Sequence, residues 1–288
     1  MSIFFKLFRF LLAGYVLVCL VLYFSQEKLI FAPVRLETDH QFSFPSKFEE
    51  VHLTTKDGAV LSGLHFYAKK SGIARQLERM ALWDDPKKAA ILFFHGNAGN
   101  LDDWGTYNEF FTNLGHDFFI FDYRGFGKSA GRIGNEKTLL DDANLMFERV
   151  LKDFKKDRIV VVGYSIGSGV AAEVAANFGI SKLVLVGPYF RFDDLAKEKF
   201  PFVPRFLVKF KIPTADFLQD FAKKYPASQT YIFHGTHDSV INISHSRRLA
   251  ELSGNGGGFF PIDCGHDDIL DNAEFLNILG NILHESSE

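Results

Sequence analysis

The stretch IVVVGYSIGSGVAAEVAA, residues 159–176, decides the fold of this chain. Its first four residues form an apolar, β-branched run that is typical of a buried strand, and the alanine-rich part after Gly167 is typical of a helix. Ser165 therefore falls on the turn between them. Residues 163–167, GYSIG, form a G-x-S-x-G motif, in which glycines let a strand turn sharply into a helix and leave the serine hydroxyl exposed. The motif predicts a nucleophilic serine; an ordinary strand-to-helix turn is the alternative.

An acid and a base follow Ser165 in the order that a Ser-Asp-His triad along one sheet edge requires. Residues 229–238, QTYIFHGTHD, predict a short strand that runs into a turn ending in Asp238. Residues 257–266, GGFFPIDCGH, predict a second strand and a turn ending in His266. The sequence therefore predicts Ser165, Asp238 and His266 as a catalytic triad.

The segment HGNAGN, residues 95–100, is the second informative motif. It follows a predicted strand, residues 89–94, at the position from which such an enzyme draws half of its oxyanion hole. We expect the backbone N–H groups of Asn97 and Ile166 to bind the oxyanion. His95 is interpreted as a structural histidine of the loop, because His266 fills the role of the base.

Composition narrows the function classes. The chain has 288 residues, enough for one large α/β domain, and 47% of them are hydrophobic. Its formal net charge is −3, and no basic stripe is visible, which argues against a nucleic-acid partner. The two cysteines, Cys19 and Cys264, lie in an apolar span and beside the proposed catalytic loop, so they predict neither a disulfide nor a metal site.

The N-terminal segment predicts a membrane anchor. Residues 10–24, FLLAGYVLVCLVLYF, are uninterrupted apolar chain, and extension back to Ile3 makes a full crossing feasible with Lys6 and Arg9 at the interface. Because no small-x-small cleavage site follows, an uncleaved signal anchor is favoured over a cleaved signal peptide. The positive residues before the span favour a single-pass protein whose catalytic domain lies on the non-cytoplasmic side.

We expect the anchor and its connector to occupy residues 1–47, with the connector beginning at residue 25, and the catalytic α/β domain to occupy residues 48–288. A polar stretch, residues 69–88, predicts a surface insertion. Residues 189–226 mix phenylalanines with lysines and arginines, which predicts a helical lid at a lipid interface; a helix pair that packs its aromatic side chains on the core is the alternative.

Five segments in a fixed order resemble the membrane-anchored α/β-hydrolase-domain (ABHD-type) serine hydrolases, close to the prolyl-oligopeptidase-like branch. They are FFHGNAGN (93–100), FDYRGFGKSAG (121–131), GYSIGSGVA (163–171), HGTHDSVI (234–241) and CGH (264–266). The resemblance implies the α/β-hydrolase fold, with an eight-stranded, mostly parallel sheet flanked by helices. One departure is GPYFRF (187–192), where relatives commonly carry a polar loop.

These observations together predict a serine hydrolase of carboxylic esters or thioesters, with acyl or lipid-like substrates, working through an acyl-enzyme and needing no metal or organic cofactor. A serine peptidase of the prolyl-oligopeptidase-like type is one alternative. A non-catalytic binding protein with the hydrolase fold is another, and an acyltransferase would share the triad.

Overall fold

Short apolar runs form the strands of one central sheet. The computed structural model describes residues 2–69, 89–254 and 256–284, so nearly all of the predicted insertion lies outside the described residues. The strands are β1 (Ala32–Pro33), β2 (Phe48–Thr54), β3 (Val60–Phe66), β4 (Ala90–Phe94), β5 (Ala98–Gly99), β6 (Asp117–Phe121), β7 (Ile159–Tyr164), β8 (Lys182–Val186), β9 (Gln229–Gly235) and β10 (Gly257–Ile262). Eight of them pair in the order β10-β9-β8-β7-β4-β6-β3-β2, and only β3 runs antiparallel to its neighbours, β2 and β6. The predicted mostly parallel, eight-stranded sheet is confirmed.

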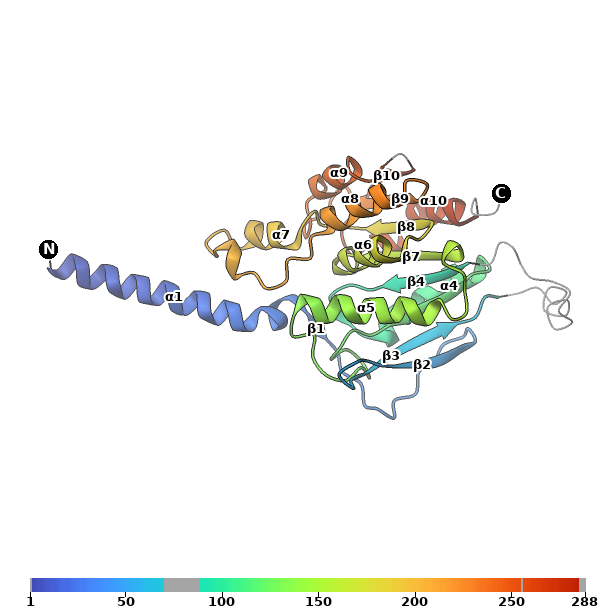
Figure 1. Cartoon of the computed structure of the whole chain (residues 1–288), viewed down its shortest axis with the longest axis horizontal. Helices are drawn as coiled ribbons and strands as arrows, with labels where there is room; N and C mark the ends of the chain where they lie inside the picture. The colour runs from blue at the N-terminus through green and yellow to red at the C-terminus, as the bar shows by residue number, and fades with distance from the viewer. Residues whose placement is uncertain (1, 70–88, 255, 285–288) are drawn as a thin grey trace, which may run out of the picture.

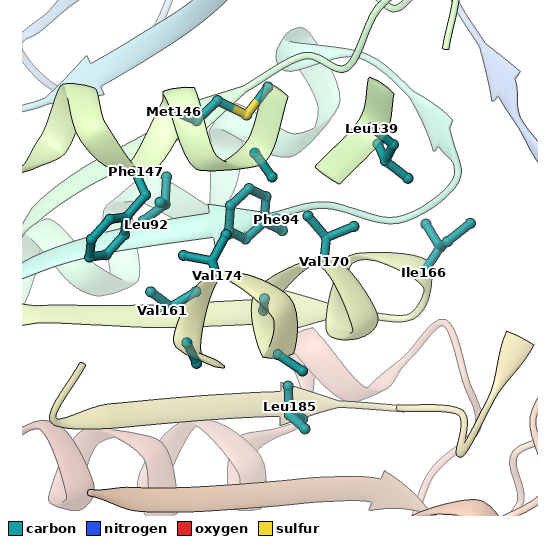
Figure 2. Close-up of a cluster of buried hydrophobic side chains, with 14 of the residues drawn as sticks. Leu92, Phe94, Leu139, Met146, Phe147, Val161, Ile166, Val170, Val174 and Leu185 are labelled. Atoms are coloured by element: carbon teal, nitrogen blue, oxygen red, sulfur yellow. The ribbon is translucent and has the colours of Figure 1, made fainter. Parts of the chain in front are cut away.

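Helices cover both faces of this sheet (Figure 1). They are α1 (Ser2–Ile30), α3 (Leu101–Trp104), α4 (Asn108–Asn113), α5 (Glu136–Val150), α6 (Ile166–Phe178), α7 (Phe192–Lys199), α8 (Thr214–Lys224), α9 (Ser244–Ala250) and α10 (Ala273–His284). Successive strand residues point to opposite faces. In β4, Leu92 and Phe94 join the core under α5, α6 and α8, shown in part in Figure 2, whereas Ile91 and Phe93 join the core under α4 and α10.

Helix α1 extends past the predicted boundary at residue 24 and ends at Ile30, so the prediction that the connector begins at residue 25 is wrong. The last turns are stabilised by contacts with the rest of the protein, such as the 2.9 Å ion pair between Glu27 and Arg132. Phe31 then enters the core, and β1 pairs in parallel with β5. By length and composition, α1 could cross a membrane.

The predicted lid, residues 189–226, divides into two parts. Helix α8 packs on α6 as an ordinary flanking helix, and its Leu218 and Phe221 are buried in the core. Residues 192–209, called the cap segment below, comprise α7 and the residues that follow it and leave Phe200, Phe202 and Phe206 exposed. Packing of aromatic side chains on the core therefore describes α8, and for the cap segment a lid at a lipid interface stays a prediction.

His95, the first residue after β4, and Asp122, the first residue after β6, form a buried pair of ionisable side chains. His95 and Asp122 are both fully buried, and His95 Nε2 lies 3.7 Å from Asp122 Oδ1. Burial lowers the pKa of His95 to about 4. Burial also raises the pKa of Asp122 well above its usual range, and the backbone N–H of Leu101 offsets only part of that rise. His95 thus has the surroundings of a structural side chain, the interpretation that the sequence favours.

We expect Asp122→Asn to remove a contribution to the free energy of unfolding that decreases as pH rises. The unfolded carboxyl loses its proton at about pH 4, whereas the folded one keeps it, so the stability that Asp122 contributes falls as pH rises through the interval between the two pKa values. Within that interval the variant should gain on the order of 1 kcal/mol per pH unit relative to wild type.

Urea unfolding from about pH 4.5 to about pH 7 measures this difference. Asp220→Asn, at an exposed carboxylate 3.5 Å from Lys224, is the control and should follow the wild-type curve. Identical pH dependence in wild type and Asp122→Asn would contradict the expectation.

Candidate active site

Ser165 sits on the turn between β7 and α6 in a strained backbone conformation. Its φ is 52° and its ψ is −119°, a region that non-glycine residues rarely adopt. The flanking glycines permit the turn, because a Cβ on Gly163 would lie 2.4 Å from the carbonyl oxygen of Gly167, and a Cβ on Gly167 would lie 2.2 Å from that of Phe94. The turn therefore requires glycine at both positions.

The structure brings together the three residues that the sequence predicts as a triad. Each follows a parallel strand at the same edge of the sheet: Ser165 after β7, Asp238 after β9 and His266 after β10. His266 Nε2 lies 3.0 Å from Ser165 Oγ, and His266 Nδ1 lies 2.6 Å from Asp238 Oδ2. This is the geometry in which an imidazole can accept the serine proton while a carboxylate orients the ring.

Asp238 is held as an anion by several donors. Its Oδ1 accepts hydrogen bonds from the backbone N–H groups of Val240 and Ile241, at 2.8 and 2.7 Å. Burial opposes ionisation of this carboxyl, but hydrogen bonds from His234, His266 and the Ile241 backbone outweigh it and hold the pKa of Asp238 well below its usual range. The carboxylate is thus available to stabilise a positive charge on His266.

His234 is a residue of this site that the sequence interpretation missed. It is fully buried at the end of β9, and its Nε2 lies 2.8 Å from the Ile241 carbonyl oxygen and 3.2 Å from Asp238 Oδ2. Its Nδ1 lies 2.6 Å from Ser246 Oγ. Donation of the Ser246 hydroxyl to Nδ1 leaves the imidazole proton on Nε2, which faces the Ile241 carbonyl oxygen and, slightly farther away, Asp238 Oδ2. The sequence signal that could have identified it is a histidine four residues before Asp238, near the end of a predicted buried strand.

The segment that departs from the family pattern, residues 187–192, contacts the site. Gly187 has a φ of +56°, and a Cβ there would lie 3.1 Å from Cε1 of His266. Tyr189 is fully buried, and its hydroxyl donates to the Ile166 carbonyl oxygen over 3.2 Å. The segment therefore packs against both the imidazole ring and the start of α6.

The two backbone N–H groups predicted for the oxyanion hole lie at the same pocket as Ser165. Asn97 and Ile166 both line it, and Ile166 is the first residue of α6, where helix N–H groups have no partner within the helix. The Asn97 side chain does not face a substrate; its Nδ2 donates to the Ile30 carbonyl oxygen at 2.6 Å. Asn97 thus joins the predicted oxyanion loop to the end of α1.

The pocket at Ser165 has a volume of about 360 Å³ and a mostly apolar lining. Its wall combines the cap segment with residues of α1, and the α1 contributors are Leu22, Tyr23, Gln26, Leu29 and Ile30. In the described parts of the chain, no group of three or more His, Cys, Asp or Glu side chains is placed to hold a metal ion.

Comparison with solved structures confirms the predicted α/β-hydrolase fold. The esterase Pf2001 of Pyrococcus furiosus superposes with a TM-score of 0.66 at 17% identity, covering 90% of this chain and 98% of that one. A structure described as a predicted CIB-like hydrolase from Thermoplasma acidophilum gives a TM-score of 0.56 at 18% identity, covering 83% of this chain and 99% of that one.

Sequence comparison gives the family. The protein YfhR of Escherichia coli (strain K12), named as uncharacterized, is 30% identical over 221 residues, which are 73% of this chain and 69% of that protein. The alpha/beta hydrolase domain-containing protein 17B of Xenopus laevis is 28% identical over 203 residues, 67% of this chain and 65% of the relative. The family model Hydrolase_4, described as serine aminopeptidase, S33, matches residues 85–229. This match spans just over half of the chain and contains the Ser165 turn, and the chain accordingly belongs to the Hydrolase_4 family of α/β-hydrolases, as its resemblance to ABHD-type hydrolases predicts.

Proposed function

We propose that this hydrolase cleaves carboxylic esters or thioesters through a Ser165-His266-Asp238 triad and an acyl-enzyme. The observation that carries the proposal is the continuous set of contacts from Ser165 Oγ through the His266 ring to Asp238, at 3.0 and 2.6 Å. The first distance puts the nucleophile within hydrogen-bond reach of its base, and the second puts the base within reach of the acid that orients it. The strained backbone of Ser165 adds support, because such conformations concentrate at functional sites.

The reaction follows from the proton positions. With His266 Nδ1–H donated to Asp238, Nε2 is free to take the hydroxyl proton of Ser165 as its oxygen attacks the acyl carbonyl. The N–H groups of Asn97 and Ile166 bind the oxyanion of the tetrahedral intermediate, and His266 then returns its proton to the leaving group. Water, deprotonated by His266, releases the acid and restores Ser165.

Apolar acyl substrates fit the lining of the pocket. Most of its lining surface is apolar, and its volume of about 360 Å³ is at the small end of the range for ligand pockets. The similarity in fold to a Pyrococcus furiosus esterase supports ester chemistry without identifying a substrate. We therefore propose acyl esters and thioesters of lipid-like character as the preferred substrates.

A serine aminopeptidase is the second candidate, since the family description names that activity. Such an enzyme binds a free amino terminus, and the pocket offers the exposed carboxylate of Asp267 for this contact. Lys197 and Lys199 line the same pocket, and their positive charges oppose binding of an amine, whereas the charge of Arg205 is paired with Asp193 and Asp194. Charge thus favours the ester hydrolase.

We also propose that α1 is an uncleaved signal anchor. Lys6 and Arg9 lie before the apolar span and favour a cytoplasmic N-terminus, with the catalytic domain on the non-cytoplasmic side. Protease protection in sealed vesicles tests the orientation: a catalytic domain that is digested from the cytoplasmic side would reverse it.

Ser165→Ala should abolish labelling by a fluorophosphonate probe and lower kcat on p-nitrophenyl esters by about 10⁴-fold or more, because it removes the attacking oxygen. Ser239→Ala, at an exposed serine beside Asp238, is the matched control and should retain both activities. Aminoacyl p-nitroanilides, assayed in parallel, separate the aminopeptidase from the esterase. Absence of labelling in folded wild-type protein would favour a non-catalytic binding protein.

His234→Asn should lower kcat by about 10- to 100-fold with little change in KM, because Asp238 loses a charge-assisted hydrogen bond worth about 1.5–3 kcal/mol. His234→Gln is the matched variant, since its amide can reach the place of Nε2 and restore the donor to Asp238. Steady-state kinetics compare the two. Equal losses in both variants would mean that His234 only fills space.

A further inference from the structure

Helix α1 consists of two parts with different surroundings. Residues 3–21 are exposed apart from Cys19 and span about 28 Å at about 1.5 Å per residue, close to the ~30 Å hydrocarbon core of a bilayer. Residues 22–30 instead dock on the catalytic domain and line the pocket of Ser165. In the proposed membrane orientation, the pocket therefore opens where α1 leaves the bilayer.

The cap segment is fixed against α1 by hydrogen bonds from both sides. Gln26 Nε2 donates to the Leu207 carbonyl oxygen, and Gln26 Oε1 accepts from the backbone N–H of Lys209, both at 2.8 Å. Farther along the helix, the Tyr15 hydroxyl donates to the Phe202 carbonyl oxygen at 2.9 Å. In Figure 1, α7 projects from the same end of the domain as α1.

These contacts give the cap segment a depth relative to the membrane. Tyr15 lies within the exposed part of α1, so Phe202 beside it enters the outer part of the bilayer. Phe200, Phe202 and Phe206 are 42%, 54% and 80% exposed, and lipid contact would cover their rings. The Lys209 Nζ lies 4.1 Å from the centre of the Tyr23 ring, the pairing of cation and aromatic ring found at membrane interfaces.

The pocket runs along α1 from the interface to the nucleophile. Ile30, whose carbonyl oxygen accepts from Asn97, marks its Ser165 end, and Leu22 lies eight residues, or about 12 Å, farther along the helix. The polar atoms of Gln26, on the same wall, already bond the cap segment. An apolar, unbranched ligand matches this mostly apolar space, which extends along α1.

We propose that the pocket between α1 and the cap segment binds one acyl chain of a membrane lipid ester, which reaches Ser165 from the bilayer. This inference rests on the proposed ester hydrolysis and defines its substrate. Helix α1 is then a wall of the substrate site as well as an anchor. With its ester carbonyl at Ser165, the chain lies along α1, and its terminal methyl group lies toward Leu22 and the bilayer.

Chain-length preference tests the site. With the full-length protein in phosphatidylcholine nanodiscs, Leu22→Trp should lower the ratio of kcat/KM for p-nitrophenyl palmitate to that for p-nitrophenyl acetate by about tenfold or more, because the indole fills the far end of the pocket. Leu20→Trp, at a neighbouring exposed leucine outside the pocket, is the control and should leave the ratio unchanged. An unchanged ratio in Leu22→Trp would overturn the proposal.

A binding measurement separates this proposal from the proposed chemistry. A palmitic acid analogue with a diazirine on a carbon close to its carboxyl group, added to nanodiscs containing Ser165→Ala, should crosslink to buried pocket residues such as Tyr189, whose hydroxyl bonds the Ile166 carbonyl oxygen beside residue 165. Crosslinks confined to residues 3–21 of α1 would refute the acyl-chain site even if wild-type protein hydrolyses esters. Crosslinks in the pocket of Ser165→Ala, together with a wild-type protein that does not react with the fluorophosphonate, would support the site and reject the ester hydrolase.

Discussion

The close approach of α6 to β7 and β4 is the constraint on which the site depends. Gly167 packs against the Phe94 carbonyl oxygen at a distance that a Cβ would forbid, and Gly163 packs against Gly167 itself. Because the helix starts this close to the sheet, its first N–H group lies beside the loop that leaves β4, where Asn97 is found. The close packing at these two glycines thus holds the backbone of Ser165 in its strained conformation and brings together the two N–H groups proposed to bind the oxyanion.

Asp238 and Asp122, two carboxyl groups near the same edge of the sheet, show how their surroundings shift a pKa in opposite directions. Asp238 accepts hydrogen bonds from two backbone N–H groups and two imidazoles, and burial does not prevent its ionisation. Asp122 is at least as buried but has far weaker compensation, and its pKa rises. The donors aimed at Asp238 therefore lower its pKa and suit it to orient His266, whereas deeper burial with fewer donors raises the pKa of Asp122 under the loop of His95.

The sequence predicts those parts of the structure that depend on order along the chain. Parallel strands end at one edge, so a serine, an aspartate and a histidine that each follow a strand are expected to meet. Other features depend on distant contacts. Composition could not separate the exposed Phe206 from the buried Phe221, because each stands in a similar mixture of aromatic and basic residues. His234 escaped notice for a related reason: its role depends on Ser246 and Ile241, which only the fold brings to its ring.

The junction between α1 and the domain links membrane position to chemistry. If a flexible linker joined α1 to the domain, movement of the helix would not affect the site. Instead, β1 follows the helix almost directly and pairs with β5. The backbone N–H of Ala32 also donates to the Asn97 carbonyl oxygen at 2.8 Å. Phe31, between them, is buried against Phe126 and Phe210. A tilt of α1 relative to the domain would therefore strain the loop that carries the Asn97 N–H. In the proposed membrane arrangement, this junction would hold the mouth of the pocket at one depth, and the same contacts hold in place the loop proposed to bind the oxyanion.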